Sequence, residues 1–220
     1  MKTKKTNRYG NGLKKFGLCA FTAALISVNV CQPYIYPVYA DDVQEESSAQ
    51  AGIETMYIST VDDFLEFAAN CYIDSWSVNK KIVLRNNLDF TGRELVMVPV
   101  FAGEFDGNGH TISGSDFTGE SYVTAIFRYV EENGVIDSLN VKGNIAALDE
   151  QECVGGIVGS NYGTIKNCSF EGNVSGKKTI GGIAAFNKST GVIKKCEVRG
   201  RITGSYYTGG ITGINHGIIN

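Results

Sequence analysis

Residues 154–176 read VGGIVGSNYGTIKNCSFEGNVSG, and residues 180–204, IGGIAAFNKSTGVIKKCEVRGRITG, follow the same pattern. A third copy, TGGITGINHGIIN, begins at Thr208 and reaches only the early part of the pattern by Asn220. Repeats at a fixed period of 20–50 residues indicate stacked structural units. The repeat therefore decides the fold, and the rest of the chain is interpreted around it.

The most regular part of the repeat is a stretch of 14 residues. It aligns without gaps over 134–147, 163–176 and 191–204, at offsets of 29 and 28 residues. Apolar and polar positions alternate in it, as in a strand with one buried face. The apolar columns are Ile136/Ile165/Ile193/Ile219, Leu139/Cys168/Cys196, Val141/Phe170/Val198 and Ile145/Val174/Ile202, with Gly143/Gly172/Gly200 between them.

One such unit cannot bury its apolar face alone, but units stacked about 4.8 Å apart can. The pattern therefore predicts an all-β parallel β-solenoid of coils of about 26–29 residues. The segments GGIVG, GGIAA and GGITG predict a short second strand in each coil.

Polar columns of the repeat also have structural explanations. Asn161, Asn187 and Asn215 each lie six residues after the first Gly of a GG pair. We expect them to form a ladder at a turn, each bonded to backbone and to the next Asn. The outward columns mix positive and negative charge, which is typical of a solvated face: Asp137/Lys166/Lys194 and Lys142/Glu171/Arg199.

The first 40 residues have the anatomy of a secretory signal peptide. Six basic residues and no acid lie in 1–15, and a mostly apolar run of 15 residues follows over 16–30. Val38-Tyr39-Ala40 fits a cleavage site, and the apolar run is short for a membrane span. We expect a secreted or cell-surface protein with no membrane span after cleavage.

Residues 41–52, DDVQEESSAQAG, are acidic, small and polar, and predict a disordered linker. Without residues 1–40 the chain has 14 basic and 23 acidic residues, a net charge of −9. Nucleic-acid binding requires a basic surface, so this balance argues against it.

Four cysteines remain beyond the leader: Cys71, Cys153, Cys168 and Cys196. They are too few for a disulfide-built scaffold and show no metal-binding spacing. The Cys168/Cys196 column should point into the core, where free Cys behaves as a small buried hydrophobe. A disulfide between these two stays open, although stacked parallel strands offer poor geometry for it.

The region before the repeats has a different pattern of apolar and polar residues. Thr60 and Asp63 form a near-capping box, and apolar residues then recur at helical spacing, which predicts a helix over 61–71. Strands are predicted over 80–90 and 94–100, and FAGEFDGNGHTISG, 101–114, predicts a turn that returns to strand. We expect 53–114 to be a cap and first coil, with the helix covering strand edges. Residues 115–220 are then the β-helix repeats, the last incomplete.

The stretch 154–176 resembles the GLUG-motif repeat of secreted bacterial proteins, with its GG pair, the Asn and the Asn-Cys core. The resemblance covers about 53–220, although IAAFN at 183–187 and the NKST turn depart from the pattern. It implies a right-handed parallel β-helix, to which the helix predicted over 61–71 adds a short N-terminal cap. The family occurs in adhesin-like surface proteins and beside IgA-cleaving metallopeptidase domains, and it implies no catalytic residue here.

The acids Glu104, Asp89, Asp106 and Asp116 are the candidates for an enzymatic function, because many carbohydrate-active enzymes are β-helices that use paired carboxyls. Asp106 precedes Gly-Asn-Gly and is explained as a turn residue. Arg85, Asp89 and Arg93 belong to the lead-in rather than to repeated coils. His110 and His216 are expected to be structural, and no zinc-protease, phosphate-loop or nucleophile-elbow motif is present.

We therefore predict no catalytic, cofactor or metal residues. The expected function is a non-catalytic adhesion, display or spacer module, the N-terminal part of a larger surface protein. The alternatives are a carbohydrate-active β-helix enzyme, such as a polysaccharide lyase, and a non-catalytic segment of a surface protease. Partners would be host or cell-surface glycans or proteins. Tyr162, Tyr206 and Tyr207 are the aromatic residues placed between coils that could stack on sugars.

Overall fold

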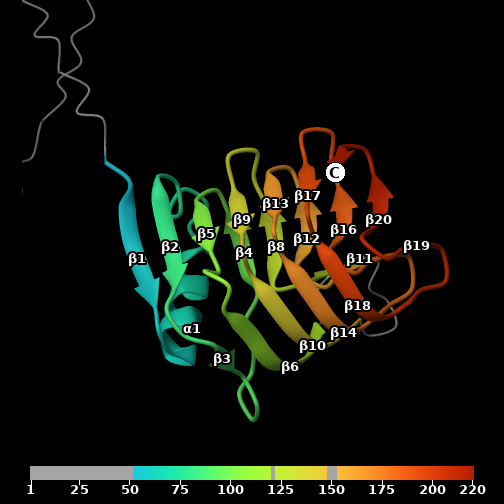
Figure 1. Cartoon of the computed structure of the whole chain (residues 1–220), viewed down its shortest axis with the longest axis horizontal. Coiled ribbons are helices and arrows are strands. Elements are labelled where there is room, and N and C mark those ends of the chain that lie inside the picture. The colour runs from blue at the N-terminus through green and yellow to red at the C-terminus, as the bar shows by residue number, and fades with distance from the viewer. Residues whose placement is uncertain (1–51, 120–121, 148–152) are drawn as a thin grey trace, which may run out of the picture. The chain divides into compact units, whose positions relative to one another are not determined.

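A computed structural model describes residues 52–119, 122–147 and 153–220. The expected signal peptide and the expected linker, apart from Gly52, lie outside these residues. The described chain is all-β with one short helix, and its parallel strands stack in about six turns of about 28 residues, a β-solenoid (Figure 1). The solenoid and its coil length confirm the prediction from the repeat.

Four parallel sheets form the walls of the solenoid, each built from one strand per coil. Sheet 1 has the order β1 (Glu54–Ile58), β2 (Lys80–Leu84), β5 (Glu104–Asp106), β9 (Val135–Asp137), β13 (Thr164–Lys166), β17 (Val192–Lys194) and β21 (Ile218–Ile219). Sheet 2 has the order β3 (Leu88–Asp89), β6 (Thr111–Gly119), β10 (Asn140–Ala147), β14 (Ser169–Ser175) and β18 (Glu197–Thr203).

The other two walls come from the second half of each coil. Sheet 3 has the order β7 (Val123–Thr124), β11 (Cys153–Gly155), β15 (Thr179–Gly181) and β19 (Tyr207–Gly209). Sheet 4 has the order β4 (Val98–Phe101), β8 (Phe127–Val130), β12 (Val158–Asn161), β16 (Ala184–Asn187) and β20 (Thr212–Asn215).

The register of the strands is the one that the repeat columns predicted. Ile165 pairs with Ile136 on one side and Ile193 on the other, and Phe170 stacks between Val141 and Val198. The apolar columns point inward: Ile136, Ile165 and Phe170 are fully buried. Large aromatic side chains fill the end of the core near the helix, where Phe67, Phe101 and Phe105 make edge-on contacts.

The repeat coils turn from sheet 1 into sheet 2 through a residue with positive φ. Ser138, Asn167 and Lys195 have φ of 52, 53 and 51°. Further along the coil Gly172 and Gly200 adopt φ of 145 and 147°, and a Cβ on Gly172 would lie 1.9 Å from the carbonyl oxygen of Gly143. The Gly143/Gly172/Gly200 column is therefore fixed by close approach of neighbouring coils.

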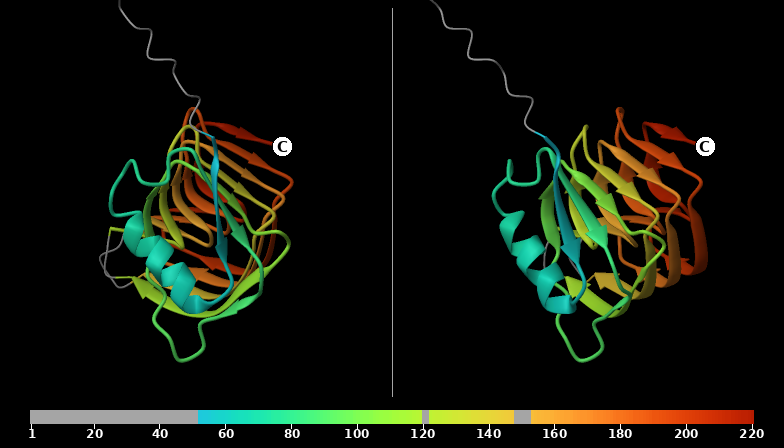
Figure 2. Two further views of the ribbon diagram at one scale, coloured as in Figure 1. Left: turned by 90° about the vertical axis from the view of Figure 1, so that its left-hand side faces the viewer. Right: turned by 60° about the vertical axis from the view of Figure 1, so that its left-hand side comes forward.

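The capping helix α1 (Val61–Asn70) confirms the predicted amphipathic segment and ends one residue earlier than expected. Thr60 accepts a hydrogen bond from the Asp63 N–H, and the Asp63 carboxylate accepts from the Thr60 N–H, which completes the capping box. The buried residues Phe64, Phe67 and Ala68 face the core. Figure 2 shows α1 lying across the end of the solenoid, with β1 beside it.

Three strand predictions were wrong in detail. The GG pairs do not lie inside one strand: Gly155 ends β11, and β12 starts after the corner at Val158. The stretch 80–90 is likewise divided between β2 and β3, because the chain bends from sheet 1 to sheet 2 at 85–87. Residues 94–97 are not strand, and pairing starts with β4 at Val98. Short strands and sharp corners divide stretches whose sequence resembles one continuous strand.

Candidate functional site

The Asn161/Asn187/Asn215 ladder is confirmed and lies on the inner side of sheet 4. The Asn161 Nδ2 donates to the Asn187 Oδ1 at 2.8 Å, and the Asn187 Nδ2 donates to the Asn215 Oδ1 at 2.8 Å. Asn161 and Asn187 are fully buried, and each also donates to a turn carbonyl, of Gly163 and Gly191 respectively. These amides connect coils and turns, so they are structural groups.

The outer face of sheet 2 carries a second polar ladder that the sequence interpretation missed. The Asn144 Nδ2 donates to the Asp116 Oδ1 at 2.9 Å, and the Asn173 Nδ2 donates to the Asn144 Oδ1 at 2.8 Å. The Ser169 hydroxyl donates to the Asn140 Oδ1 at 2.6 Å in a parallel row. The offsets of 28 and 29 residues between Asp116, Asn144 and Asn173 match the repeat period and were the available signal.

Charged columns on the outer surface pair along the solenoid axis. The Lys142 Nζ lies 2.9 Å from the Glu171 Oε2, and the Lys166 Nζ lies 3.1 Å from the Asp137 Oδ2. The Lys142 ammonium lowers the pKa of Glu171, and the pKa of Asp137 is also lowered, by hydrogen bonds that outweigh its partial burial. The mixed-sign face is therefore a set of exposed ion pairs, as expected, and such pairs contribute little to stability.

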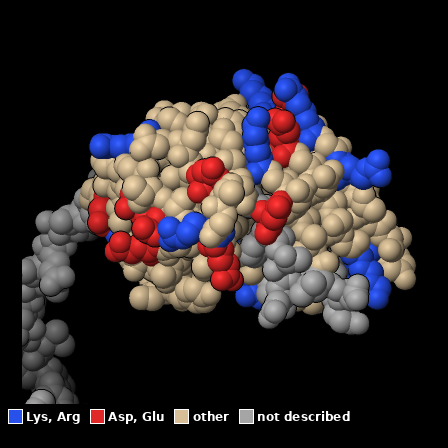
Figure 3. Space-filling view, turned by 90° about the horizontal axis from the view of Figure 1, so that it is seen from below, with Lys and Arg blue, Asp and Glu red and all other residues tan. Residues whose placement is uncertain are grey.

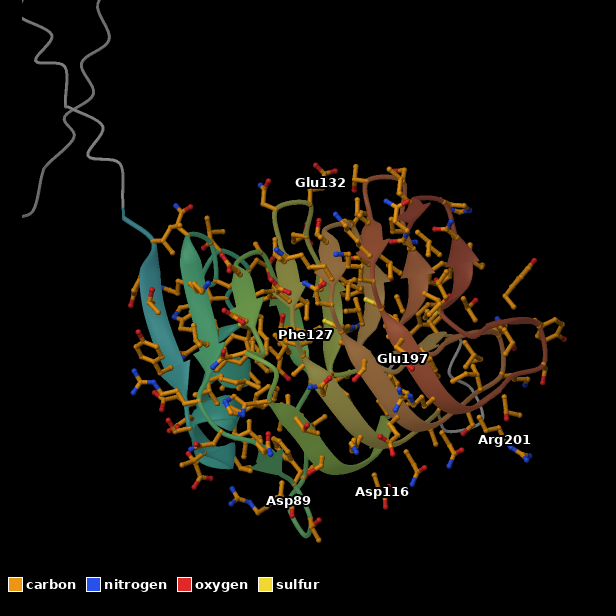
Figure 4. All side chains as sticks on the ribbon, in the orientation of Figure 1. Asp89, Asp116, Phe127, Glu132, Glu197 and Arg201 are labelled. Carbon is orange, nitrogen blue, oxygen red and sulfur yellow. The ribbon has the colours of Figure 1, made fainter. Side chains whose placement is uncertain are left out.

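The acids considered for catalysis are distributed over two sheets, and their carboxylates already interact with neighbouring groups. Glu104 and Asp106 on β5 both contact the Lys81 ammonium, at 2.7 and 3.4 Å. The Asp89 carboxylate on β3 accepts from the N–H and hydroxyl of Thr91, which lowers its pKa, and Asp106 accepts from the N–H of Asn108. Figure 4 shows Asp89 and Asp116 projecting outward, away from Glu197 and Arg201 near the opposite end.

The lead-in cations and the histidines are likewise not assembled into one site. The Arg85 guanidinium lies over the Tyr57 ring at 3.7 Å, whereas Arg93 pairs with Asp62 of the helix. His110 contacts the Asn87 side chain at 3.3 Å, and the exposed His216 donates its backbone N–H to Asn187. Among the described residues, no group of three or more His, Cys, Asp or Glu is arranged to hold a metal ion.

The four thiols are free and differ in environment. Burial raises the pKa of Cys71 to about 12 and that of Cys153 to about 11. Cys168 is buried as expected, and its stacked neighbour Cys196 is half-buried. A hydrogen bond between them raises the pKa of the Cys168 thiol and lowers that of Cys196 to about 7.

The candidate aromatic residues lie at different corners of the coil. Tyr162 follows β12, and the Lys188 ammonium lies 5.9 Å from its ring and 4.2 Å from the Phe186 ring. Tyr206 lies in the turn between β18 and β19, and Tyr207 is the first residue of β19; their exposed fractions are 69% and 60%. The structure therefore does not unite these three residues in one sugar-stacking surface.

Two of the hollows on the described surface are small and lie toward opposite ends of the solenoid. One, of about 110 Å³, lies between α1 and β1 and is lined by Met56, Tyr57, Glu66 and neighbours. The other, of about 80 Å³, lies on sheet 2 against Ser169, Glu171, Glu197 and Arg199. Both are small beside the 300–1,000 Å³ of ordinary ligand pockets, so neither has the size of a small-molecule site.

Comparison with known proteins identifies a known sequence motif in the central repeat. The sequence profile of the GLUG motif matches residues 150–175. Halomucin of Haloquadratum walsbyi is 35% identical over 85 residues, which cover 38% of this chain and 1% of halomucin. A putative Gly-rich membrane protein of Evansella cellulosilytica is 34% identical over 74 residues, 32% of this chain and 8% of that protein.

The matched stretches are thus a small part of both relatives. No solved structure matches. Within the described residues, no helix is long and apolar enough to cross a membrane. The resemblance stated from the sequence is confirmed over its central repeat: residues 150–175 of this chain are a GLUG motif.

Proposed function

We propose that this chain is a non-catalytic module of a secreted or cell-surface protein, where it serves as a display surface for adhesion or as a spacer. The observation that carries the proposal is the use of its polar side chains. Asn161 and Asn187 join coils inside, and Asp116, Asn144 and Asn173 join coils outside. These polar side chains are engaged in holding the solenoid together.

The relatives support a place at the cell surface. One of them is named halomucin and the other a putative Gly-rich membrane protein, and the chain matches them over 85 and 74 residues. A stack of about six coils also spans about 29 Å along its axis, which suits a spacer. We place the chain in a larger surface protein on these grounds.

The test of location is cell fractionation with protease treatment of intact cells. Antibodies against the solenoid should detect it in the medium or on the cell surface, where added protease removes it. Intact cells that protect the whole chain from protease would overturn the proposal.

A glycan or protein ligand for the display surface is part of the same proposal. The chain should be retained on host or cell-surface glycans, or on surface proteins, without converting them. A panel of polysaccharides incubated with the chain should release no reducing ends and no unsaturated uronates. Release that is lost in Glu171→Gln or Glu197→Gln would instead establish a β-helix enzyme acting at the hollow on sheet 2.

A further inference from the structure

Rows of outward-facing side chains change from acid to base along the axis of the solenoid. One row on sheet 1 contains two acids and then two bases: Asp106, Asp137, Lys166 and Lys194. One row on sheet 2 begins with an acid and ends with a base: Asp116, Asn144, Asn173 and Arg201. In Figure 3 most acidic atoms on the visible face lie toward the cap and most basic atoms toward the other end. The outer walls of the later coils are therefore a basic surface on a chain that is acidic elsewhere.

The coil that contains β17 and β18 has a series of exposed cations, which we call the basic strip: Lys194, Lys195, Arg199 and Arg201. Lys194 ends β17, Lys195 forms the corner between sheets 1 and 2, and the arginines lie on β18. Among the described residues, no acid pairs with Lys194, Lys195 or Arg201, whereas Arg199 pairs with Glu197 at 2.8 Å. Figure 4 shows Arg201 projecting away from the ribbon. Because the basic strip lies on the side walls, a further coil would stack beside it and leave it open to a ligand.

Groups that suit a sugar lie beside the basic strip. Asn173 is the register partner of Arg201 on the neighbouring strand β14. Its amide uses one N–H in the outer ladder, which leaves the second N–H and the Oδ1 for hydroxyl groups of a ligand. The hollow of about 80 Å³ next to Ser169 and Arg199 has room for a substituent of a sugar ring. The exposed Tyr206 follows β18 in the same coil, and its ring offers a flat apolar surface for packing.

We propose that the basic strip binds an anionic polysaccharide, which lies across the coil from the end of β17 to the turn after β18. The carboxylates or sulfates of this polymer contact Lys194, Lys195 and Arg201, its hydroxyl groups contact Asn173, and one of its rings packs on Tyr206. Lys194 and Arg201 are seven residues apart, which is at most about 23 Å of strand, so the strip spans several sugar units. This inference rests on the proposed function, because it names the ligand of the display surface.

Other partners with negative charge fit the basic strip less well. A membrane surface is bound by basic residues together with large apolar side chains that insert into it, and protein interfaces are also enriched in such side chains. In the part of the chain that the structure describes, none of the exposed large hydrophobic side chains lies on β14, β17 or β18. The acids toward the cap repel a polyanion and so direct it to the later coils.

Binding of the full chain to immobilised polysaccharides tests the proposal. Hyaluronan carries carboxylates, dextran sulfate carries sulfates, and dextran is the uncharged control. The chain should bind at least one charged polymer and not dextran, and added salt should raise the Kd, because about 0.1 M salt screens exposed charges beyond about 10 Å. A chain that binds neither charged polymer at low ionic strength, or binds dextran equally well, would overturn the proposal. Cell fractionation decides the proposed function separately, so failure to bind would overturn the ligand alone.

Removal of charge locates the binding surface. Lys194→Gln/Arg201→Gln should raise the Kd about tenfold or more, because each cation supplies charge-assisted hydrogen bonds to an anion. Arg85→Gln/Arg93→Gln is the matched control, since it removes two exposed cations near the cap and changes the net charge equally. It should leave the Kd unchanged, and circular dichroism should confirm that both variants are folded. Equal weakening in the two variants would show that only net charge matters and would contradict the basic strip.

Two further probes separate a sugar polymer from other anions. Poly-glutamate has the charge without sugar rings, and the chain should bind it more weakly than the charged polysaccharide. Tyr206→Ala should raise the Kd for the polysaccharide about threefold or more and leave that for poly-glutamate unchanged, because only the sugar packs on the ring. Equal affinity for poly-glutamate would show that the strip recognises charge alone and would overturn the proposal. Stronger binding to phosphatidylserine vesicles that is lost in Lys194→Gln/Arg201→Gln would identify a membrane surface instead and also overturn it.

Discussion

At Asn187 a single side chain holds three coils together. Its amide accepts from Asn161 of the preceding coil and donates to Asn215 of the following one, and it is fully buried. An amide in this position is costly to remove, because its partners keep their polar groups while losing the bonds that satisfied them.

Asn187→Ala should therefore lower the free energy of unfolding by about 2–4 kcal/mol, measured by urea denaturation. Asn215→Ala is the matched control: the same column on the exposed last coil should cost about 1 kcal/mol or less. Equal losses for the two variants would contradict the role of burial in the ladder.

The described cysteines should differ in their rate of alkylation, because the thiolate is the reactive nucleophile. The pKa of Cys196 is about 7, whereas those of Cys71 and Cys153 are about 12 and 11. Iodoacetamide should therefore modify Cys196 first, at a rate that rises with pH through about 7, as peptide mass spectrometry can follow. Cys196→Ser should remove the fast phase, and earlier modification of Cys153 would contradict this order.

Between neighbouring coils, the glycine columns set how closely strands and corners approach. A Cβ on Gly182 would lie 2.2 Å from the carbonyl oxygen of Gly210 in the next coil, too close for any side chain. Gly210 occupies the same column in the last coil, and nothing lies within 4 Å of a Cβ built there. A side chain at this repeat position is thus sterically excluded in one coil and has room in the next.

Gly182→Ala should destabilise the chain by about 3 kcal/mol or more, because the clash is with backbone and forces coils apart. Gly210→Ala should change stability by about 0.5 kcal/mol or less. Thermal and urea unfolding of the two variants provide the measurement. A large loss in Gly210→Ala would contradict the open space around Gly210.

How well an element could be predicted depended on how often the chain repeats it. Strands β10, β14 and β18 were predicted in register because three aligned copies define the same columns. Residues 80–101 have no copy to align, so the corner at 85–87 and the irregular stretch 94–97 were not found. The GG corner was misread because two- to four-residue walls are too short to show a period of two.

On the scale of the whole molecule, each coil meets only its two neighbours, through the same columns. Stability of such an array is approximately a sum over coils and their interfaces. Charge is also distributed unevenly at this scale: the described residues 52–119 contain 10 acidic and 4 basic residues, and 153–220 contain 2 acidic and 8 basic residues. Stacking converts this difference in position along the chain into a difference along the axis of the solenoid.

Deletion of one whole coil, residues 164–191, joins Gly163 to Val192 and keeps every column aligned. The product should retain its β circular dichroism and unfold cooperatively, with an m-value lower by about one sixth. Deletion of half a coil, residues 164–177, places polar residues on core positions and should prevent folding. Equal behaviour of the two deletions would contradict the column register.

The close stacking of Gly182 on Gly210 has a consequence for how such chains evolve. A coil that fits its neighbour also fits a copy of itself, so tandem duplication of one 28-residue segment of the gene yields a folded insertion at once. The solenoid can then gain or lose whole coils without compensating mutations elsewhere. Selection acts on glycines and asparagines of the shared columns, while the side chains on the outer surface are free to diverge from one copy to the next.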